Sequence, residues 1–161
     1  MRKFLLITMM CLFGLFTVNA QETSFFYDFN DGTLEGWNVF QESGATSENW
    51  AIGGDDYSEQ GFYYGTDGTL CIYSASYIGG NLVPKNYIVT SQPYEITSES
   101  VLSWYIRHTW PGYESYDSYS VVVSEDGVNF EQAWTAEAEL SATKEFSLSA
   151  YAGKTLYIGF Y

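Results

Sequence analysis

Apolar and polar residues alternate along much of the second half of the chain. Leu102, Trp104 and Ile106 are separated by single intervening residues. This period of two predicts a strand with one buried face over residues 102–108. The same period recurs over residues 119–123, so we expect a second strand there with one face in the core.

Short apolar runs elsewhere are separated by Gly, Asp, Asn and Ser, which favour turns. The stretch Ser124–Gly127 predicts a hairpin turn, because glycine accepts the positive φ that such turns need. Residues 41–69 are rich in glycine, and we expect them to be mostly irregular, with Trp50 as an anchor. The other expected strands span residues 24–29, 34–40, 70–77, 86–90, 130–135, 146–148 and 156–160.

Many short strands at spacings of about ten residues indicate an all-β fold. We expect a jelly-roll β-sandwich of two antiparallel sheets, with Trp and Tyr filling the space between them. The stretch CIYSASYIGGNLVPKNYIVT, residues 71–90, breaks at Gly79-Gly80-Asn81 between two β-prone runs. It predicts a hairpin-like element of the core.

The first twenty residues have the layout of a secretory signal peptide. Arg2 and Lys3 precede a short apolar run, and small residues end at Ala20. We therefore expect cleavage before Gln21 and a secreted or cell-surface protein. Residues 21–161 are then a single domain, which is long enough to build its own core.

The expected mature chain is strongly acidic. Without Arg2 and Lys3, four Lys and Arg residues remain, against all twenty Asp and Glu residues. The formal net charge of the mature chain is then −16. Such a surface repels nucleic acid and anionic membranes, so we expect neither nucleic-acid binding nor membrane insertion. Cys71 is the one remaining cysteine, and in an apolar strand we interpret it as a buried small side chain rather than a nucleophile.

Several motifs occur in an order that resembles the cleaved-adhesin domains found in the adhesin regions of gingipains, within the choice-of-anchor J and MAM-like jelly rolls. They are the run SASYIGGNLVPKNYIVT, the opening residues 29–37, Asn49-Trp50, the strand LSWY at 102–105, the segment 119–130 and the ending 148–161. The resemblance covers nearly all of residues 21–161 and implies a non-enzymatic adhesion module.

The pattern of this family continues beyond the last strand seen here. It adds a loop and a final strand, whereas this sequence stops at Tyr161. We therefore expect the domain to be truncated at its C-terminal end, with an unpaired apolar edge beside residues 156–161. Another chain, or the remainder of a larger polypeptide, would complete the sheet.

Catalytic motifs are absent from the sequence. It contains no nucleophile elbow, no His-Glu-x-x-His motif and no Cys/His cluster. His108, the one histidine, falls on the face of Trp104 and Ile106, where a packed or rim residue is more common than a base. We expect that the protein is not an enzyme.

Asp28, Asn30 and Asp31 cluster near the first expected strand. The family resemblance implies a structural calcium at this opening motif, since calcium takes oxygen ligands of these types. The same spacing fits an ordinary Asx turn equally well. The sequence leaves both interpretations open.

Residues 108–117 form a loop-like stretch with three aromatic residues and two acids. Aromatic rings stack on sugars or on peptide side chains, and carboxylates accept hydrogen bonds from them. Our candidate ligand site consists of Trp110, Tyr113, Glu114, Tyr116 and Asp117, with Tyr57 and Tyr63 as a neighbouring wall.

These features predict a secreted recognition module that binds an extracellular glycan or protein. The alternative is an accessory carbohydrate-binding domain of a secreted hydrolase or peptidase. A third reading, a domain that only spaces or packs surface assemblies, uses no ligand at all.

Overall fold

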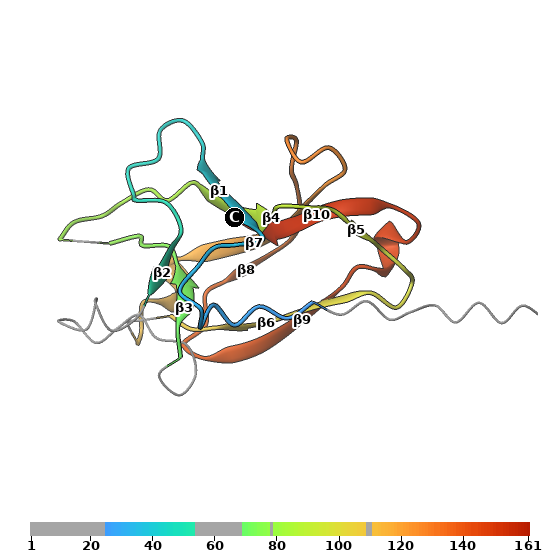
Figure 1. Cartoon of the computed structure of the whole chain (residues 1–161). Coiled ribbons are helices and arrows are strands. Elements are labelled where there is room, and N and C mark those ends of the chain that lie inside the picture. Colours follow the sequence, from blue (N-terminus) through green and yellow to red (C-terminus); the bar gives the residue numbers. More distant parts are fainter. Residues whose placement is uncertain (1–24, 54–68, 78, 109–110) are drawn as a thin grey trace, which may run out of the picture.

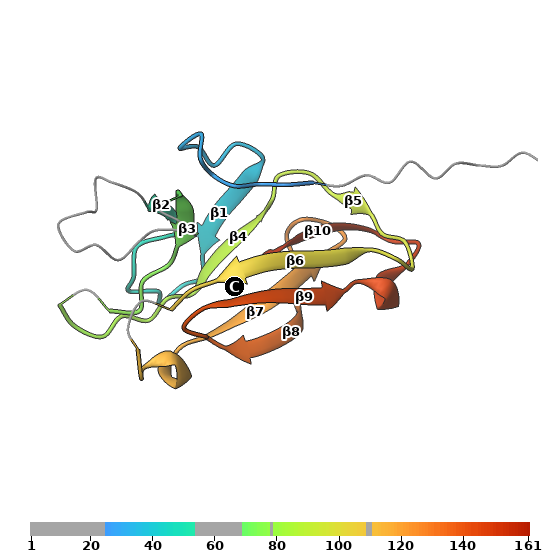
Figure 2. The ribbon, with the colours of Figure 1, turned by 90° about the horizontal axis from the view of Figure 1, so that it is seen from below.

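The computed structural model describes residues 25–53, 69–77, 79–108 and 111–161, and Figures 1 and 2 show them from two directions. Trp110, Tyr57 and Tyr63 of the candidate site, and the expected signal peptide, lie outside the described residues.

Two layers of antiparallel strands make up the domain (Figure 1). The larger layer has the strand order β1-β4-β10-β7-β8, with β5 pairing with β10 at its side. Its members are β1 (Trp37–Gln41), β4 (Asn86–Thr90), β5 (Tyr94–Glu95), β7 (Ser118–Ser124), β8 (Glu131–Glu137) and β10 (Thr155–Phe160). The second layer pairs β6 (Val101–Ile106) with β9 (Ala142–Ser147). The all-β, two-sheet sandwich is confirmed.

A third, small sheet lies at one end of the sandwich. It pairs β2 (Ala51–Gly53) with β3 (Cys71–Tyr73). Asn86 on β4 connects this end to the larger sheet, because its amide donates to the Glu48 carbonyl and to Ser74 Oγ, both at 2.8 Å. The Trp50 indole donates to the Asn86 carbonyl at 3.0 Å, so Trp50 is indeed an anchor.

The core lies between the two layers. Ile96, Val123, Leu148, Leu156 and Ile158 form its buried cluster. Beside this cluster, aromatic rings also fill the space between the two layers, as the composition predicts. The Trp104 ring on β6 contacts Tyr119, Trp134 and Phe160 of the larger sheet, with centroid distances of 6.2, 5.6 and 5.3 Å.

The strands of the second half match the sequence pattern closely. The alternating burial of β6 confirms its one buried face. In β7, by contrast, the whole run Ser120–Ser124 is buried, so the prediction of one buried face was wrong there. β7 is an interior strand of the larger sheet, between β10 and β8, and both of its faces are covered over this run. The turn at Ser124–Gly127 is confirmed, with Gly127 at φ 72°.

The prediction of a first strand over residues 24–29 is wrong for residues 25–29, the part that the structure describes. Residues 25–29 are extended but join no ladder. Phe29 adopts φ 57°, and its carbonyl accepts the Gly32 amide at 3.0 Å, so the chain turns where the strand should continue. The aromatic rings of this segment pack instead, Phe25 on Tyr94 and Tyr27 on Trp37.

The hairpin expected for residues 71–90 is also wrong. β3 pairs with β2, whereas β4 pairs with β1 and β10, so the two halves of the stretch belong to different sheets. Between them, only an isolated bridge joins Tyr77 to Asn81. Alternation identifies a strand, but the partner of that strand is decided by the rest of the fold.

The unpaired edge expected beside residues 156–161 does not exist. β10 lies inside the larger sheet, with β4 on one side and β7 on the other. Tyr161 continues this pairing, since its amide and carbonyl both bond to Ser120. Among the described strands, the open edges are found elsewhere.

Candidate functional site

The loop that connects β6 to β7 carries the exposed tyrosines of the candidate site. The structure describes this loop from residue 111 onward. Gly112 forms a turn there with φ 87°, a conformation that residues with side chains rarely adopt. A single 3₁₀ turn, η3 (Glu114–Tyr116), follows and leads directly into β7. The turn is too short to be held by its own hydrogen bonds, so contacts with other segments must fix it.

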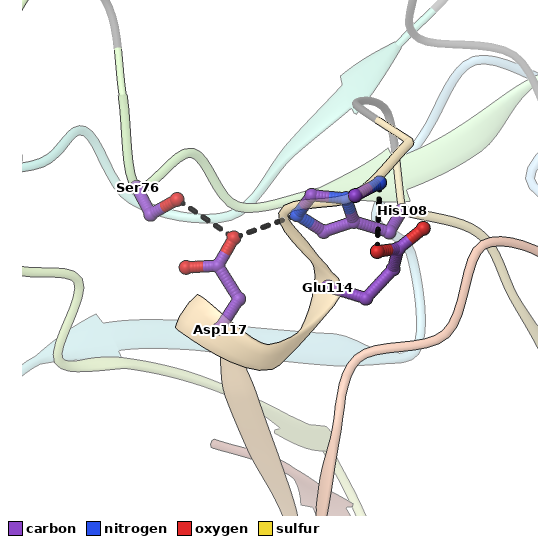
Figure 3. Close-up of polar contacts among 5 residues, drawn as sticks. Ser76, His108, Glu114 and Asp117 are labelled. Carbon is purple, nitrogen blue, oxygen red and sulfur yellow. Dashed lines mark hydrogen bonds and ion pairs between the residues drawn. The ribbon is translucent and has the colours of Figure 1, made fainter.

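Asp117 supplies those contacts. Its Oδ2 atom accepts a hydrogen bond from Ser76 Oγ at 2.9 Å and lies 2.9 Å from His108 Nε2. Figure 3 shows Ser76 and His108 approaching this carboxylate from opposite sides. The Ala138 amide also bonds to the Asp117 carbonyl at 2.8 Å. Asp117 therefore fastens the loop to the segment after β3, to the end of β6 and to the residue that follows β8.

His108 follows the end of β6 and is largely covered, with 11% of its side chain exposed. Its backbone amide donates to the Glu139 carbonyl at 2.8 Å. The residue thus lies at the rim of the sandwich and contacts a structural carboxylate, as a packed histidine does.

Glu114 is oriented by the backbone of its own loop. Its Oε2 atom accepts the Gly112 amide at 2.9 Å (Figure 3). Hydrogen bonds from the backbone amides of Glu114 and Gly112 lower the pKa of this carboxyl group, with a smaller contribution from the nearby His108. The carboxylate is therefore ionised at neutral pH and fixed beside the tyrosines.

Tyr113 precedes η3 and Tyr116 is its last residue, and both side chains are exposed to solvent. Tyr113 is 61% exposed and Tyr116 is 81% exposed. Their ring centroids are 5.8 Å apart with an interplanar angle of 39°, so the rings form a tilted pair. Two exposed aromatic faces beside an ionised carboxylate can stack on a flat apolar face of a ligand while accepting its hydrogen bonds.

The structure therefore brings Tyr113, Glu114 and Tyr116 together on one exposed turn. It places Asp117 behind them, where one carboxylate oxygen is engaged by protein groups. Ser76 was not foreseen, because it lies 41 positions away in sequence and no local pattern marks it.

The opening motif forms tight turns through its side chains. Asp28 Oδ1 accepts the Asn30 amide at 3.1 Å, and Asp31 accepts both the amide and the hydroxyl of Thr33. Asn30 Oδ1 accepts the Leu70 amide at 3.0 Å, which joins two distant segments. Asp28 and Asp31 thus form Asx-type turns with the residues that follow them, whereas the Asn30 side chain bonds to a distant segment and not to its own turn.

Oxygen atoms of all three residues are thus engaged in hydrogen bonds with the protein. Asp28 and Asp31 line a surface cavity of about 130 Å³, together with Glu35 and neighbouring residues of the same segment. Over the part of the chain that the structure describes, no cluster of three or more His, Cys, Asp or Glu side chains is arranged to hold a metal. A calcium ion here would have to compete with the hydrogen bonds of the turn.

Cys71 lies on β3 and is partly buried. Burial raises the pKa of its thiol, an effect that the charge of Arg107 only partly offsets. The thiol is therefore protonated at neutral pH and is a poor nucleophile.

Comparison with known proteins identifies one family. The family model described as Cleaved Adhesin Domain matches residues 23–153. No curated protein and no solved structure matches the chain. Within the described ranges, no helix is long and apolar enough to cross a membrane.

Proposed function

The chain belongs to the cleaved-adhesin domain family, and we propose on this basis that it is a secreted, non-enzymatic recognition module that binds extracellular glycans. The exposed pair Tyr113 and Tyr116 beside the ionised Glu114 supports this proposal most directly. Each sugar ring offers an apolar face for an aromatic ring and hydroxyl groups for a carboxylate.

The loop is suited to this role because its exposed and structural residues are separate. Asp117 holds the turn in place through Ser76 and His108. The tyrosines are then free to contact a ligand without supporting the fold. A rigid platform also binds with a smaller loss of conformational entropy than a mobile loop would.

Binding to an array of glycans and extracellular-matrix proteins tests the proposal. The wild-type protein and a Tyr113→Ala/Tyr116→Ala variant are compared on the same array. We expect retention of one or more glycans by the wild type and loss of those signals in the variant. Retention of proteins alone would replace the glycan by a protein ligand. Glycan signals that are equal for the two proteins would place the site elsewhere.

A calcium ion at Asp28, Asn30 and Asp31 is a separate part of the proposal, and it rests on the family resemblance. Calcium takes six to eight oxygen ligands, so backbone carbonyls and water would complete the set. Binding to the native state must raise the melting temperature as calcium is added. We expect a rise for the wild type and none for Asp31→Asn. A melting temperature indifferent to calcium and to chelator would remove the ion from the account.

A further inference from the structure

A second surface cavity lies at the end of the sandwich opposite the β6–β7 loop. That loop enters β7 at Ser118, whereas the cavity is lined by Ser124, the last residue of the same strand. One wall is the β7–β8 turn, and the other is the 3₁₀ turn η4 (Ser149–Tyr151) with the start of β10. Figure 2 shows η3 and η4 as short coils at opposite ends of the domain. The cavity is therefore separate from Tyr113 and Tyr116.

The cavity has a volume of about 360 Å³, and its floor belongs to the core. Val123 and Leu156 line it, and both are members of the buried core cluster with 1% exposure. Phe130 and Tyr151 add aromatic side chains to the lining. Cavities of about 300–1,000 Å³ with apolar walls and a few polar groups are typical sites for small ligands. This one is large enough for a sugar residue.

Both walls of the cavity are held in place by hydrogen bonds. In the β7–β8 turn, the Asp126 carboxylate accepts the Asn129 backbone amide at 2.8 Å and the Asn129 side-chain amide at 2.7 Å. In the opposite wall, the Lys154 carbonyl accepts the Ile96 amide at 2.9 Å, and the Gly153 amide donates to the Ile96 carbonyl at 2.8 Å. A site whose walls are already in place loses less conformational entropy when a ligand binds.

An exposed ion pair joins the two walls. Lys154 Nζ donates to Glu125 Oε1 at 2.5 Å, and 47% and 64% of these side chains are exposed. Exposed pairs contribute little to stability, so both groups can bind a ligand at little cost to the fold. The bond to Glu125 raises the pKa of Lys154 and burial raises the pKa of Tyr151, and the charge of Glu131 adds to both effects. The ammonium and phenol groups therefore keep their protons at neutral pH and act as donors.

These groups match a neutral sugar residue. Each hydroxyl group of a sugar both donates and accepts, so one hydroxyl can accept from Lys154 while its neighbour donates to Glu125 or Glu131. The apolar face of the sugar ring fits the aromatic side chains of the lining. An anionic ligand would be repelled, because three carboxylates and one ammonium line the cavity and the chain carries a formal net charge of −14. A cationic ligand would compete with Lys154 for the same carboxylates.

We propose that this cavity is a second ligand site, which binds a neutral sugar residue through Lys154, Glu125 and Glu131. The site shares no residue with the β6–β7 loop. It therefore stands whether or not Tyr113 and Tyr116 bind a glycan. One domain could then hold two sugar residues at opposite ends of the sandwich.

Titration of the full chain, followed by its amide NMR signals, tests this site directly. The probes are the methyl glycosides of glucose, galactose, mannose and N-acetylglucosamine. N-acetylneuraminic acid and agmatine serve as the anionic and cationic comparisons. We expect at least one neutral glycoside to shift the amide signals of residues 125–131 and 151–154 saturably, with a dissociation constant in the millimolar range. The two charged probes should bind more weakly there.

Lys154→Met keeps the aliphatic part of the side chain and removes the ammonium group. We expect it to weaken this binding about tenfold or more, as for the loss of a hydrogen bond to a charged group. Lys144→Met is the matched control, because Lys144 also pairs with a glutamate, Glu139, but lies outside the cavity. It should leave the affinity unchanged.

The Tyr113→Ala/Tyr116→Ala variant separates the two sites. We expect it to keep the shifts at the cavity even where its binding to the array is lost. The proposal would be overturned if no neutral glycoside shifts the cavity signals, if these shifts require Tyr113 and Tyr116, or if Lys154→Met binds as wild type does. A charged probe that binds the cavity as tightly as the neutral glycosides would overturn the assignment of a neutral ligand.

Discussion

The Nε2 atom of His108 lies 2.9 Å from the Oδ2 atom of Asp117, and Ser76 Oγ donates to the same oxygen. Asp117 thereby joins the end of β6, the segment after β3 and the start of β7. The exposed turn that carries Tyr113 and Tyr116 depends on this junction for its position (Figure 3).

Replacement of Asp117 by alanine removes both of these contacts. Hydrogen bonds to a charged group each contribute about 1.5–3 kcal/mol, and partial exposure reduces that amount. We expect Asp117→Ala to lower the free energy of unfolding by about 1–3 kcal/mol, measured by urea denaturation. Ser115→Ala, an exposed position on the same 3₁₀ turn, is the control and should change stability little. Equal stability of both variants would show that Asp117 does not support the loop.

Asn86 is buried, and its side chain joins three segments. Besides the bonds to Glu48 and Ser74, its Oδ1 atom accepts Gln41 Nε2 at 2.8 Å. Asn86→Ala leaves these partners unsatisfied, which costs about 1–3 kcal/mol for each group that stays buried. We expect a loss of about 2 kcal/mol or more in thermal or urea unfolding.

Asn38→Ala is the matched control for this prediction, because Asn38 is exposed on the neighbouring strand β1. Its effect should stay within about 0.5 kcal/mol. If the two variants are equally stable, the network around Asn86 does not hold the small β2–β3 end to the larger sheet.

Asp126 in the β7–β8 turn makes stability depend on pH. Its carboxylate accepts the amides of Val128 and Asn129, and these bonds lower its pKa below the ordinary value of 3.8. A group whose pKa is lower in the folded state stabilises the fold above its unfolded pKa and loses that contribution as pH falls.

We therefore expect wild type to be more stable than Asp126→Ala at about pH 5, and this difference to shrink between about pH 4 and pH 2. Melting curves at several pH values measure it. A difference that stays constant over this range would mean that ionised Asp126 contributes nothing to the turn.

Alternation in the sequence was sufficient to find most strands of the second half. It located β6, β7, β8 and β10 because each has apolar residues at every second position or lies between clear turns, but it found only the last two residues of β9. Alternation did not reveal β5, which has two residues. It also did not show that β7 is buried on both faces, since burial depends on neighbours from distant parts of the chain.

Pairing between strands was the main feature that the sequence did not specify. Residues 71–90 have the composition of a hairpin, yet β3 and β4 join different sheets. Segment 25–29 has the composition of a strand, but the positive φ of Phe29 and its ring contacts determine its path. The candidate loop was predicted from its composition, whereas its attachment through Ser76 required the fold.

A titration of the glycan best retained on the array tests whether the loop before β7 is the binding site. Four proteins are compared: wild type, Tyr113→Ala/Tyr116→Ala, Glu114→Gln and Tyr77→Ala/Tyr105→Ala. The last variant removes two tyrosines that are 58% and 41% exposed outside the loop. We expect the loop tyrosine variant to bind about thirtyfold more weakly, as for a binding hot spot of about 2 kcal/mol, and Glu114→Gln to be weakened less. Tyr77→Ala/Tyr105→Ala should bind as wild type does. Equal affinities of the two double variants would contradict the assignment of the site to this loop.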